Sequence, residues 1–403
     1  MTSETLTARA IAKHAISKLE AEQALDGVLR GTSKLTVRPG SLVRLRRPFL
    51  TSSGPGVDLN FTKTLWENVA YETPDVACYF YNNATVTKEL FSVRCENGIV
   101  DSETMYNCPD VSSDRGGAAE VELRQSEPAN SSYSEAKIVD GWSVLVANRW
   151  ASNYRHWHSE CVPSILLMKD ILGPREATWI VPECSEFHYF TLQALGIPRA
   201  QIFELKDYDV LCRNLVVPNS LFERTWVSNS ASSYLKAYKS LIQGKTKISL
   251  SDHSKQKHFN QQGIVNDIPR RRIYVTRRDS PVRPLLNERY VENIMEDFGF
   301  EIVNNSILTP SEQAVVFSEA EIIVGAHGAG LTNCVFASEG AIVVELRPSD
   351  VHGRSPFWDR SDWSLCNALG LQYGSICFLN DPQREDWQID LEHLRSTFTT
   401  LGW

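Results

Sequence analysis

The sequence lacks any run of about 18 consecutive apolar residues, the length that a membrane-spanning helix requires. It also lacks a basic excess, because 41 Lys and Arg stand against 49 Asp and Glu, a formal net charge of −8. Nucleic-acid-binding domains usually carry a basic footprint, so this balance argues against a nucleic-acid partner. The first residues contain no apolar signal-peptide core, and we expect a cytoplasmic location. Peripheral membrane contact, or a lumenal location if the chain is part of a longer protein, are the alternatives.

None of the nine cysteines forms a C-x-x-C pair, which argues against a zinc ribbon or a thioredoxin-type motif. We expect reduced thiols in a cytosolic protein. Six of the nine fall within the first 212 residues, so some of them would be able to pair in a lumenal protein. The Walker A pattern is absent too, and so is the H-E-x-x-H order of zinc peptidases.

The chain contains 403 residues, 42% of them hydrophobic, which is a globular composition with enough apolar material for two or three domains. We expect an N-terminal extension over residues 1–136 that packs on the first domain. It begins with an amphipathic helix, carries strands and turns over residues 36–57, and has exposed loops over residues 101–135. The remaining domains are expected over residues 137–260 and 261–403.

The first of these domains alternates strands and helices. Residues 137–148 predict a hairpin or paired strands, and a helix follows that stops at Gly173. A short strand, a helix that ends at Gly196 and a further strand complete the pattern, which is typical of a parallel sheet. The polar stretch over residues 244–272 has no apolar period and predicts a domain linker or an irregular surface loop.

The last domain repeats the alternation more clearly. A strand ends at Thr276, and apolar residues from Tyr290 to Phe298 follow at helical spacing. Thr309-Pro-Ser-Glu312 forms a capping box with proline at the first helical position. Together these segments predict an α/β, doubly wound domain whose ligands lie at the carboxyl ends of the strands.

The strongest local signal is a glycine-rich turn between an apolar strand and a helix. Glycines let a phosphate approach the backbone, and the helix start offers free N–H groups and the positive end of the helix dipole. We therefore predict phosphate or diphosphate binding here, with the alternative that the turn needs glycine only for packing. The dinucleotide fingerprint G-x-G-x-x-G does not fit, and the turn comes late in the fold. The residues concerned are His327, Gly328, Ala329, Gly330, Leu331, Thr332 and Asn333.

A second signal lies just before the helix that stops at Gly173. His156 and Glu160 are four residues apart and share a face if the helix begins early. An imidazole and a carboxylate are the usual general bases, so this pair is a candidate for deprotonating a hydroxyl group. Metal binding by His156, His158 and Glu160 is one alternative. A polar helix start around a half-buried Trp157 is the other.

A third signal is Arg277, followed by Arg278, at the carboxyl end of a strand. A guanidinium there suits anion recognition, although surface solvation is an equal alternative for Arg278. Glu345 ends another strand and either accepts hydrogen bonds from ribose or base hydroxyls or pairs with one of the arginines.

These segments, in this order, resemble glycosyltransferase family 61, which includes plant xylosyl- and arabinosyltransferases, animal O-GlcNAc transferase-like enzymes and bacterial surface-polysaccharide members. The resemblance covers roughly residues 137–380. The matching residues are Asn153, Tyr154, His156, Trp157, Glu160, Thr276, Arg277, Asn287, Glu288, Gly299 to Glu301, Glu312, Gln313, Gly325 to Asn333 and Val343 to Leu346. His158 and Ser159 stand where many bacterial members carry apolar residues.

The resemblance implies a GT-B architecture, in which two Rossmann-like domains face a cleft. It also implies inverting transfer from a nucleotide sugar, a UDP-sugar, to a glycan, lipid-linked or protein acceptor, with no metal and no other cofactor required. Glu160 and His156 are then the catalytic candidates, Asn153, Trp157 and His158 lie on the acceptor side, and the glycine-rich turn, both arginines and Glu345 hold the donor. A phospho- or pyruvyltransferase on a related fold, or a non-catalytic nucleotide-sugar-binding protein, are the rival interpretations.

Overall fold

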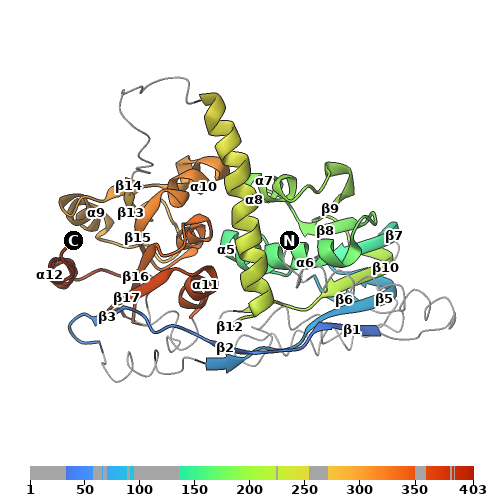
Figure 1. The fold of residues 1–403 in the computed structure, drawn as a ribbon, viewed down its shortest axis with the longest axis horizontal. Coiled ribbons are helices and arrows are strands. Elements are labelled where there is room, and N and C mark those ends of the chain that lie inside the picture. The colour runs from blue at the N-terminus through green and yellow to red at the C-terminus, as the bar shows by residue number, and fades with distance from the viewer. Residues whose placement is uncertain are drawn as a thin grey trace, which may run out of the picture. The chain divides into compact units, whose positions relative to one another are not determined.

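The computed structural model divides the chain into two compact units, residues 1–41 with 72–223 and residues 42–71 with 224–403 (Figure 1). The first combines a mixed sheet with helices and the second a parallel sheet with helices, which confirms the α/β class. The described residues are 33–57, 66, 70–88, 91–94, 136–223, 226–253, 271–349, 360–381, 384 and 386–403.

Two of the sequence expectations, the N-terminal amphipathic helix and the loops over residues 101–135, lie outside the described residues. Within the described part of the chain, no helix is both long and apolar enough to cross a membrane.

The first unit is built on a seven-stranded sheet in the order β1-β5-β10-β7-β8-β9, with β6 paired to β5. Strands β10, β7, β8 and β9 are parallel neighbours, and β5 runs antiparallel to β10. The segment from residue 137 is therefore one strand within this sheet, and the hairpin alternative is wrong. The strands are β1 (Ser33–Arg38), β5 (Val76–Val86), β6 (Val93–Arg94), β7 (Lys137–Leu145), β8 (Thr178–Pro182), β9 (Ile202–Leu205) and β10 (Val210–Pro218).

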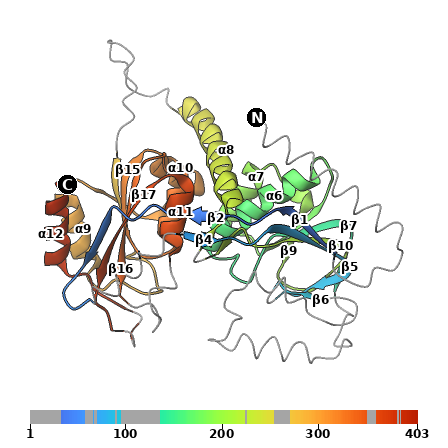
Figure 2. The ribbon, with the colours of Figure 1, turned by 60° about the horizontal axis from the view of Figure 1, so that its bottom comes forward.

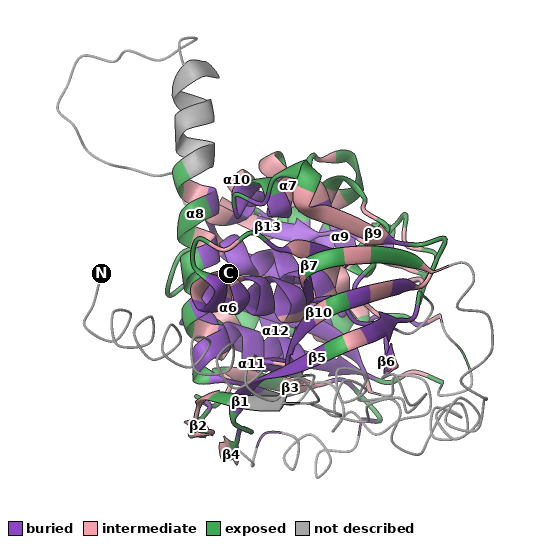
Figure 3. Ribbon diagram, turned by 90° about the vertical axis from the view of Figure 1, so that its right-hand side faces the viewer, coloured by how far each residue is buried: buried purple, intermediate pink, exposed green. Residues whose placement is uncertain are grey.

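The two predicted helices of this unit are present. Helix α6 (Val162–Leu172) is buried along most of its length (Figure 3), and it ends at Gly173 in a positive-φ conformation of 60°. Helix α7 (Glu186–Ala194) begins with a capping box at Ser185 and lies between β8 and β9 in the chain. A short α5 (Tyr154–His156) and a π-helical turn, η3 (Trp157–Cys161), run directly into α6.

The second unit is built on a six-stranded parallel sheet in the order β14-β13-β15-β16-β17-β3. Its last five strands along the chain therefore stand in the order 2-1-3-4-5, a doubly wound arrangement whose direction reverses between β13 and β15. The strands are β3 (Leu50–Ser53), β13 (Arg271–Val275), β14 (Glu301–Val303), β15 (Ala320–Ala326), β16 (Ile342–Pro348) and β17 (Gln372–Phe378).

Helices cover both faces of this sheet, as the alternation predicted. Figure 2 shows α9 (Glu288–Asp297) and α12 (Leu391–Leu401) on one face and α10 (Pro310–Ser318) and α11 (Ser361–Leu369) on the other. Val344 and Leu346 of β16 belong to the core under α9 and α12. Because side chains alternate along a strand, Glu345 and Arg347 project to the opposite face, where both are nearly fully buried.

Three details differ from expectation. Helix α8 (Asn229–His253) includes residues 244–253, so the linker interpretation is wrong there, and residues 254–270 lie outside the described chain. The helix after the glycine-rich turn is a 3₁₀ helix, η6 (Ala329–Phe336). Within residues 1–136, β1, β5 and β6 belong to the first sheet, whereas β3 pairs with β17 in the second.

Candidate active site

The π-helical turn of the first unit brings the predicted polar residues together. Asn153 is the N-cap of α5, and its Oδ1 accepts the backbone N–H of Arg155 at 2.9 Å. The helix thus begins early enough for His156 and Glu160 to share a face. π-helical turns are rare and recur at functional sites.

A glutamate joins two partners in this turn. His156 Nδ1 lies 2.6 Å from Glu160 Oε1, with 14% and 13% of the two side chains exposed. Asn148 donates from Nδ2 to the second oxygen of Glu160, Oε2, at 2.7 Å. The ring of Trp150 stacks on the His156 ring with centroids 6.0 Å apart. Both oxygens of Glu160 are therefore engaged by side chains at the protein surface.

The neighbouring aromatic residues have a different environment. His158 is 1% exposed, and its ring lies 4.3 Å from the Tyr154 ring and 6.0 Å from the Phe187 ring between centroids. Burial, together with the nearby His188, lowers the pKa of His158 to about 3, so its imidazole is neutral. Trp157 is fully buried against His188 at 4.6 Å. Both side chains hold the turn against α7.

His188 completes this packing with both ring nitrogens in use. The backbone N–H of Ser185 donates to Nδ1 at 3.0 Å, so the proton sits on Nε2, which donates to the Ala151 carbonyl at 3.0 Å. Burial lowers the pKa of His188 as well. A neutral histidine thus connects α7 to the segment that carries the His156–Glu160 pair.

In the second unit the candidate residues meet where the strand order reverses. Arg277 follows β13, and the glycine-rich turn follows β15, the two strands between which ligands bind in doubly wound sheets. A Cβ atom added at Gly328 would lie 1.6 Å from Arg277 Nη1. The guanidinium therefore packs directly on the backbone of the turn, and only glycine leaves it room.

The guanidinium of Arg277 is half-buried and partly engaged. Its Nη2 donates to the Val282 carbonyl at 2.7 Å and to Ser280 Oγ at 3.1 Å. Its Nε is buried without a hydrogen-bond partner among the described residues. Burial, and secondarily the charge of Arg283, lowers the pKa of Arg277. Such a cation gains from the approach of an anion.

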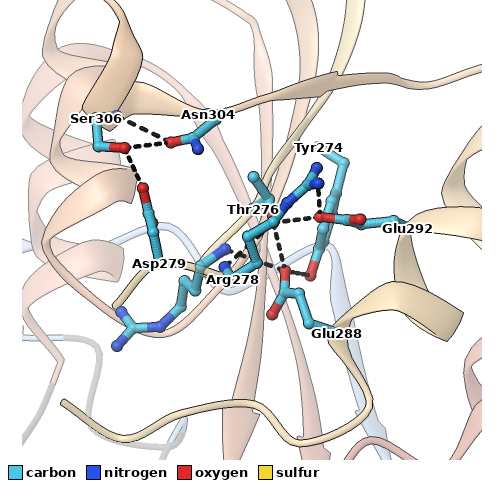
Figure 4. A network of polar contacts seen from close by, with 9 residues as sticks. Tyr274, Thr276, Arg278, Asp279, Glu288, Glu292, Asn304 and Ser306 are labelled. Carbon is cyan, nitrogen blue, oxygen red and sulfur yellow. Dashed lines mark hydrogen bonds and ion pairs between the residues drawn. The ribbon is translucent and has the colours of Figure 1, made fainter. Parts of the chain in front are cut away.

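A buried network of carboxylates holds the turn that carries Arg277 (Figure 4). Glu288 Oε1 accepts the backbone N–H of Arg277 at 3.1 Å, the Tyr274 hydroxyl at 2.8 Å and the Thr276 hydroxyl at 3.1 Å. Burial raises the pKa of Glu288. Arg278, in contrast, is exposed and pairs with Glu292 at 3.1 Å.

The same edge carries a second polar cluster at the ends of β13 and β14. Ser306 donates its hydroxyl to Asp279, and its backbone N–H donates to Asn304 Oδ1 at 3.0 Å (Figure 4). The hydrogen bond from Ser306 lowers the pKa of Asp279. The two strand ends are thereby tied together beside Arg277.

His327 also contacts a glutamate, but in the interior. Its Nδ1 lies 2.5 Å from Glu345 Oε1, and the two side chains are 4% and 2% exposed. Glu345 also accepts the Tyr373 hydroxyl, and Arg347 Nη1 lies 3.8 Å from its Oε2. Burial raises the pKa of Tyr373 well above its ordinary value. His327 and Glu345 thus anchor the turn to the sheet.

Asp362 extends this cluster into a possible ligand set for a cation. His327, Glu345 and Asp362 each offer one ligand atom, all within 4.8 Å of one another. The buried guanidinium of Arg347 already supplies positive charge beside Glu345, which disfavours a second cation there. The arrangement suits an internal charge network better than a metal centre.

At the start of η6, the first two residues are more exposed to solvent than the three that follow. Ala329 and Gly330 are half-exposed, whereas Leu331, Thr332 and Asn333 are buried. Asn333 donates to Gln313 Oε1 at 2.8 Å, and Gln313 in turn donates to the carbonyls of Asn305 and Leu308. The backbone of the turn is thus its accessible part.

The sequence analysis did not predict three residues that contact the two histidine–glutamate pairs: Asn148, Trp150 and Tyr373. Asn148 ends the segment predicted as paired strands and Trp150 follows that segment, and no spacing links either residue to Glu160. Tyr373 faces Glu345 only through the pairing of β16 with β17. Glu288 belongs to the family-61-like motif, which assigns it no role.

Residues 154–344 match the family model described as Glycosyltransferase 61. Among curated proteins, this chain is similar to two from Oryza sativa subsp. japonica, Alpha-1,3-arabinosyltransferase XAT3, at 30% identity over 101 residues, and Alpha-1,3-arabinosyltransferase XAT2, at 28% over 101 residues. Each alignment covers 23% of this chain and 16% of the rice protein. The two rice proteins are thus matched over a small part of their length.

Proposed function

We propose, from the premise that residues 154–344 of this chain belong to glycosyltransferase family 61, that this glycosyltransferase is an inverting enzyme. It moves a sugar from a nucleotide sugar, a UDP-sugar, to a hydroxyl group of a glycan or another acceptor, without a required metal. The observation that carries this proposal is the hydrogen-bonded His156–Glu160 pair, 2.6 Å apart and partly open to solvent.

The first unit supplies the base. Because both oxygens of Glu160 are occupied, we assign the proton-accepting role to the remaining ring nitrogen of His156, Nε2, with Glu160 as its orienting partner. The acceptor oxygen forms a bond to the anomeric carbon while its proton passes to Nε2. The bond from that carbon to the diphosphate breaks, and its electron pair leaves with the diphosphate. A single displacement of this kind inverts the anomeric configuration.

The second unit supplies fixed donors for the leaving group. Arg277 Nη1 and the backbone N–H groups of Ala329 and Gly330 stand where the strand order reverses. Oriented donors of this kind stabilise charge that develops on a departing diphosphate, so the role of a divalent cation can fall to protein groups. A GT-B arrangement of the two Rossmann-like units belongs to the same proposal.

The partners and the location also belong to this proposal. The acceptor is a glycan, a lipid-linked glycan or a protein, and no nucleic acid takes part. The site of action is the cytoplasm, with peripheral contact to a membrane as the route to a lipid-linked acceptor.

The proposal is tested by thermal stabilisation with a panel of nucleoside diphosphates and nucleotide sugars, with and without a chelator. A shift with UDP and one UDP-sugar that survives chelation is expected. Arg277→Ala should lose the shift, whereas Glu160→Gln should retain it and form product more slowly than the wild-type protein. A shift that requires added metal would refute the metal-independent mechanism, and a shift only with another nucleotide would reassign the donor.

A further inference from the structure

Asn148 follows β7 in the chain, precedes the family match at residues 154–344, and has no role in the assignments above. Its side chain is 7% exposed, and both ends of its amide are engaged. Nδ2 lies 2.7 Å from Glu160 Oε2, and Oδ1 lies 2.9 Å from the backbone nitrogen of Trp150.

The backbone of Trp150 determines which way this amide points. A backbone N–H can only donate, so the amide atom that faces it must be the oxygen. The amide nitrogen of Asn148 is therefore turned toward Glu160 and donates to it. The Glu160 oxygen at this contact, Oε2, is then an acceptor, and a donated hydrogen bond favours a carboxylate over a neutral carboxyl group.

The same reasoning extends to the histidine. With a carboxylate at Glu160, the proton in the 2.6 Å contact between His156 and Glu160 must come from Nδ1. In the neutral ring, Nε2 then carries the lone pair. The stacked ring of Trp150 limits rotation of this imidazole, and the backbone of the same residue orients Asn148.

We infer that Asn148 is a positioning residue, which keeps Glu160 an acceptor and thereby selects the His156 tautomer whose Nε2 is free to take a proton. This inference rests on the proposed function only in calling His156 the base. The assignment of the tautomer itself depends on the three contacts and on a carboxylate at Glu160, and on no substrate.

The first test measures the tautomer without any substrate. Long-range proton–nitrogen NMR of protein labelled with ¹⁵N-histidine distinguishes a protonated from an unprotonated ring nitrogen, and His156→Gln identifies the signal. At neutral pH, wild-type His156 should be protonated at Nδ1, in at least about tenfold excess over the other tautomer. A ring protonated at Nε2 would overturn the inference.

The second test uses Asn148→Asp, which keeps the acceptor for Trp150 and replaces the donor by a carboxylate. Two carboxyl groups at 2.7 Å cannot both stay ionised, so the pair takes up one proton, and Glu160 donates to Nδ1 whenever it holds that proton on Oε1. The two tautomers should then approach equal populations. An unchanged tautomer ratio in this variant would show that Asn148 does not select it.

A matched control comes from the same unit. Asn219 bridges two backbone groups, Ala77 N and Asp75 O, at 2.8 and 2.6 Å. Asn219→Asp loses the same kind of donor but should leave the His156 signal unchanged, and an equal change in both variants would reduce Asn148 to a structural role.

Product formation separates this inference from the proposed function. Asn148→Asp should lower turnover about 10²-fold with unchanged stabilisation by UDP, because a misoriented base affects the chemical step. If the tautomer behaves as expected but the wild-type protein forms no product, the proposed function fails and the inference stands. If product forms while the tautomer is wrong, the inference fails alone.

Discussion

The two units each place a histidine Nδ1 against a glutamate oxygen, at 2.6 Å for His156–Glu160 and 2.5 Å for His327–Glu345. The contacts are alike, but the environments are not. The first pair keeps 14% and 13% of its side chains exposed, whereas the second keeps 4% and 2%. The first can meet a substrate, and the second lies inside the protein.

The two pairs also differ in the other groups that contact the glutamate. Asn148 is neutral and donates to Glu160, so it adds no charge to the pair in the first unit. In the second unit, Tyr373 donates to Glu345, and the cation of Arg347 lies 3.8 Å away. A buried charge needs such compensation, whereas a partly solvated one does not. Identical residue pairs are thus expected to serve chemistry in one unit and stability in the other.

The largest expected effect is a loss of turnover when the His156–Glu160 pair of the first unit is disrupted. His156→Gln removes the nitrogen assigned as base and should lower turnover by about 10²- to 10⁴-fold, the usual contribution of a general base. The rate of UDP release from the donor in the presence of acceptor measures it. His158→Phe, two residues away and buried, is the control and should retain turnover near neutral pH. Equal losses in the two variants would mean that the whole turn is structural.

The next largest expected effect is a loss of stability when the His327–Glu345 pair of the second unit is disrupted. Glu345→Gln removes a buried negative charge that lies 3.8 Å from the Arg347 guanidinium and should lower the free energy of unfolding by about 3 kcal/mol. Denaturant unfolding measures this loss. Glu301→Gln, which removes the surface partner of Arg271 in the same unit, should cost less than about 1 kcal/mol. A variant at Glu345 with wild-type stability and no turnover would place Glu345 in the donor site instead.

Local patterns predicted much of this fold. The helix stop at Gly173, the capping box at Thr309 and the alternation of strands and helices depend on neighbouring residues, and the structure confirms them. The contact between His156 and Glu160 followed from helical spacing in the same way. Such features are encoded within about ten residues of chain.

Features that depend on distant pairing were not predicted. Strand β3 joins the second sheet beside β17, more than 300 positions along the chain, and a four-residue strand carries no signal for its partner. The burial of Glu345 likewise depends on which sheet face it occupies and on Tyr373 across β17. The roles of the candidate site residues stay predictions, because the geometry locates these side chains without testing what they bind.

A smaller effect tests the burial of His158 in the π-helical turn through the pH dependence of stability. The folded-state pKa of His158 is about 3, below the ordinary 6.5, so the unfolded chain takes up this proton first as the pH falls. The stability contribution is complete above pH 6.5 and is lost toward pH 3. At pH 5 the loss is about 2 kcal/mol. His158→Phe keeps an aromatic ring against Tyr154 and should reduce this loss, as measured by unfolding at pH 7.5 and 5.

Burial also lowers the pKa of His188, so this residue likewise reduces the stability of the folded protein as the pH falls. The His158→Phe variant should therefore retain part of the stability loss at pH 5. An acid loss of the same size in His158→Phe and in the wild-type protein would show that His158 is not buried as a neutral ring.

The smallest effect tests how the second unit holds Arg277. Gly328→Ala places a methyl group 1.6 Å from the present position of Nη1, so the guanidinium must move away from the turn. Affinity for UDP should fall about tenfold, which corresponds to about 1.4 kcal/mol. Gly244→Ala, where no neighbour lies within 4 Å of the added Cβ, should leave this affinity unchanged. Calorimetric titration with UDP measures all of these affinities.

A double-mutant cycle then separates Arg277 from the backbone of the turn. If Gly328→Ala acts only by displacing the guanidinium, it should cost nothing further once Arg277→Ala is present. A full tenfold loss in the Arg277→Ala background would instead mean that the methyl group blocks the N–H groups of Ala329 and Gly330. The diphosphate would then be held mainly by the backbone N–H groups of the glycine-rich turn, and the arginine would contribute less to its affinity.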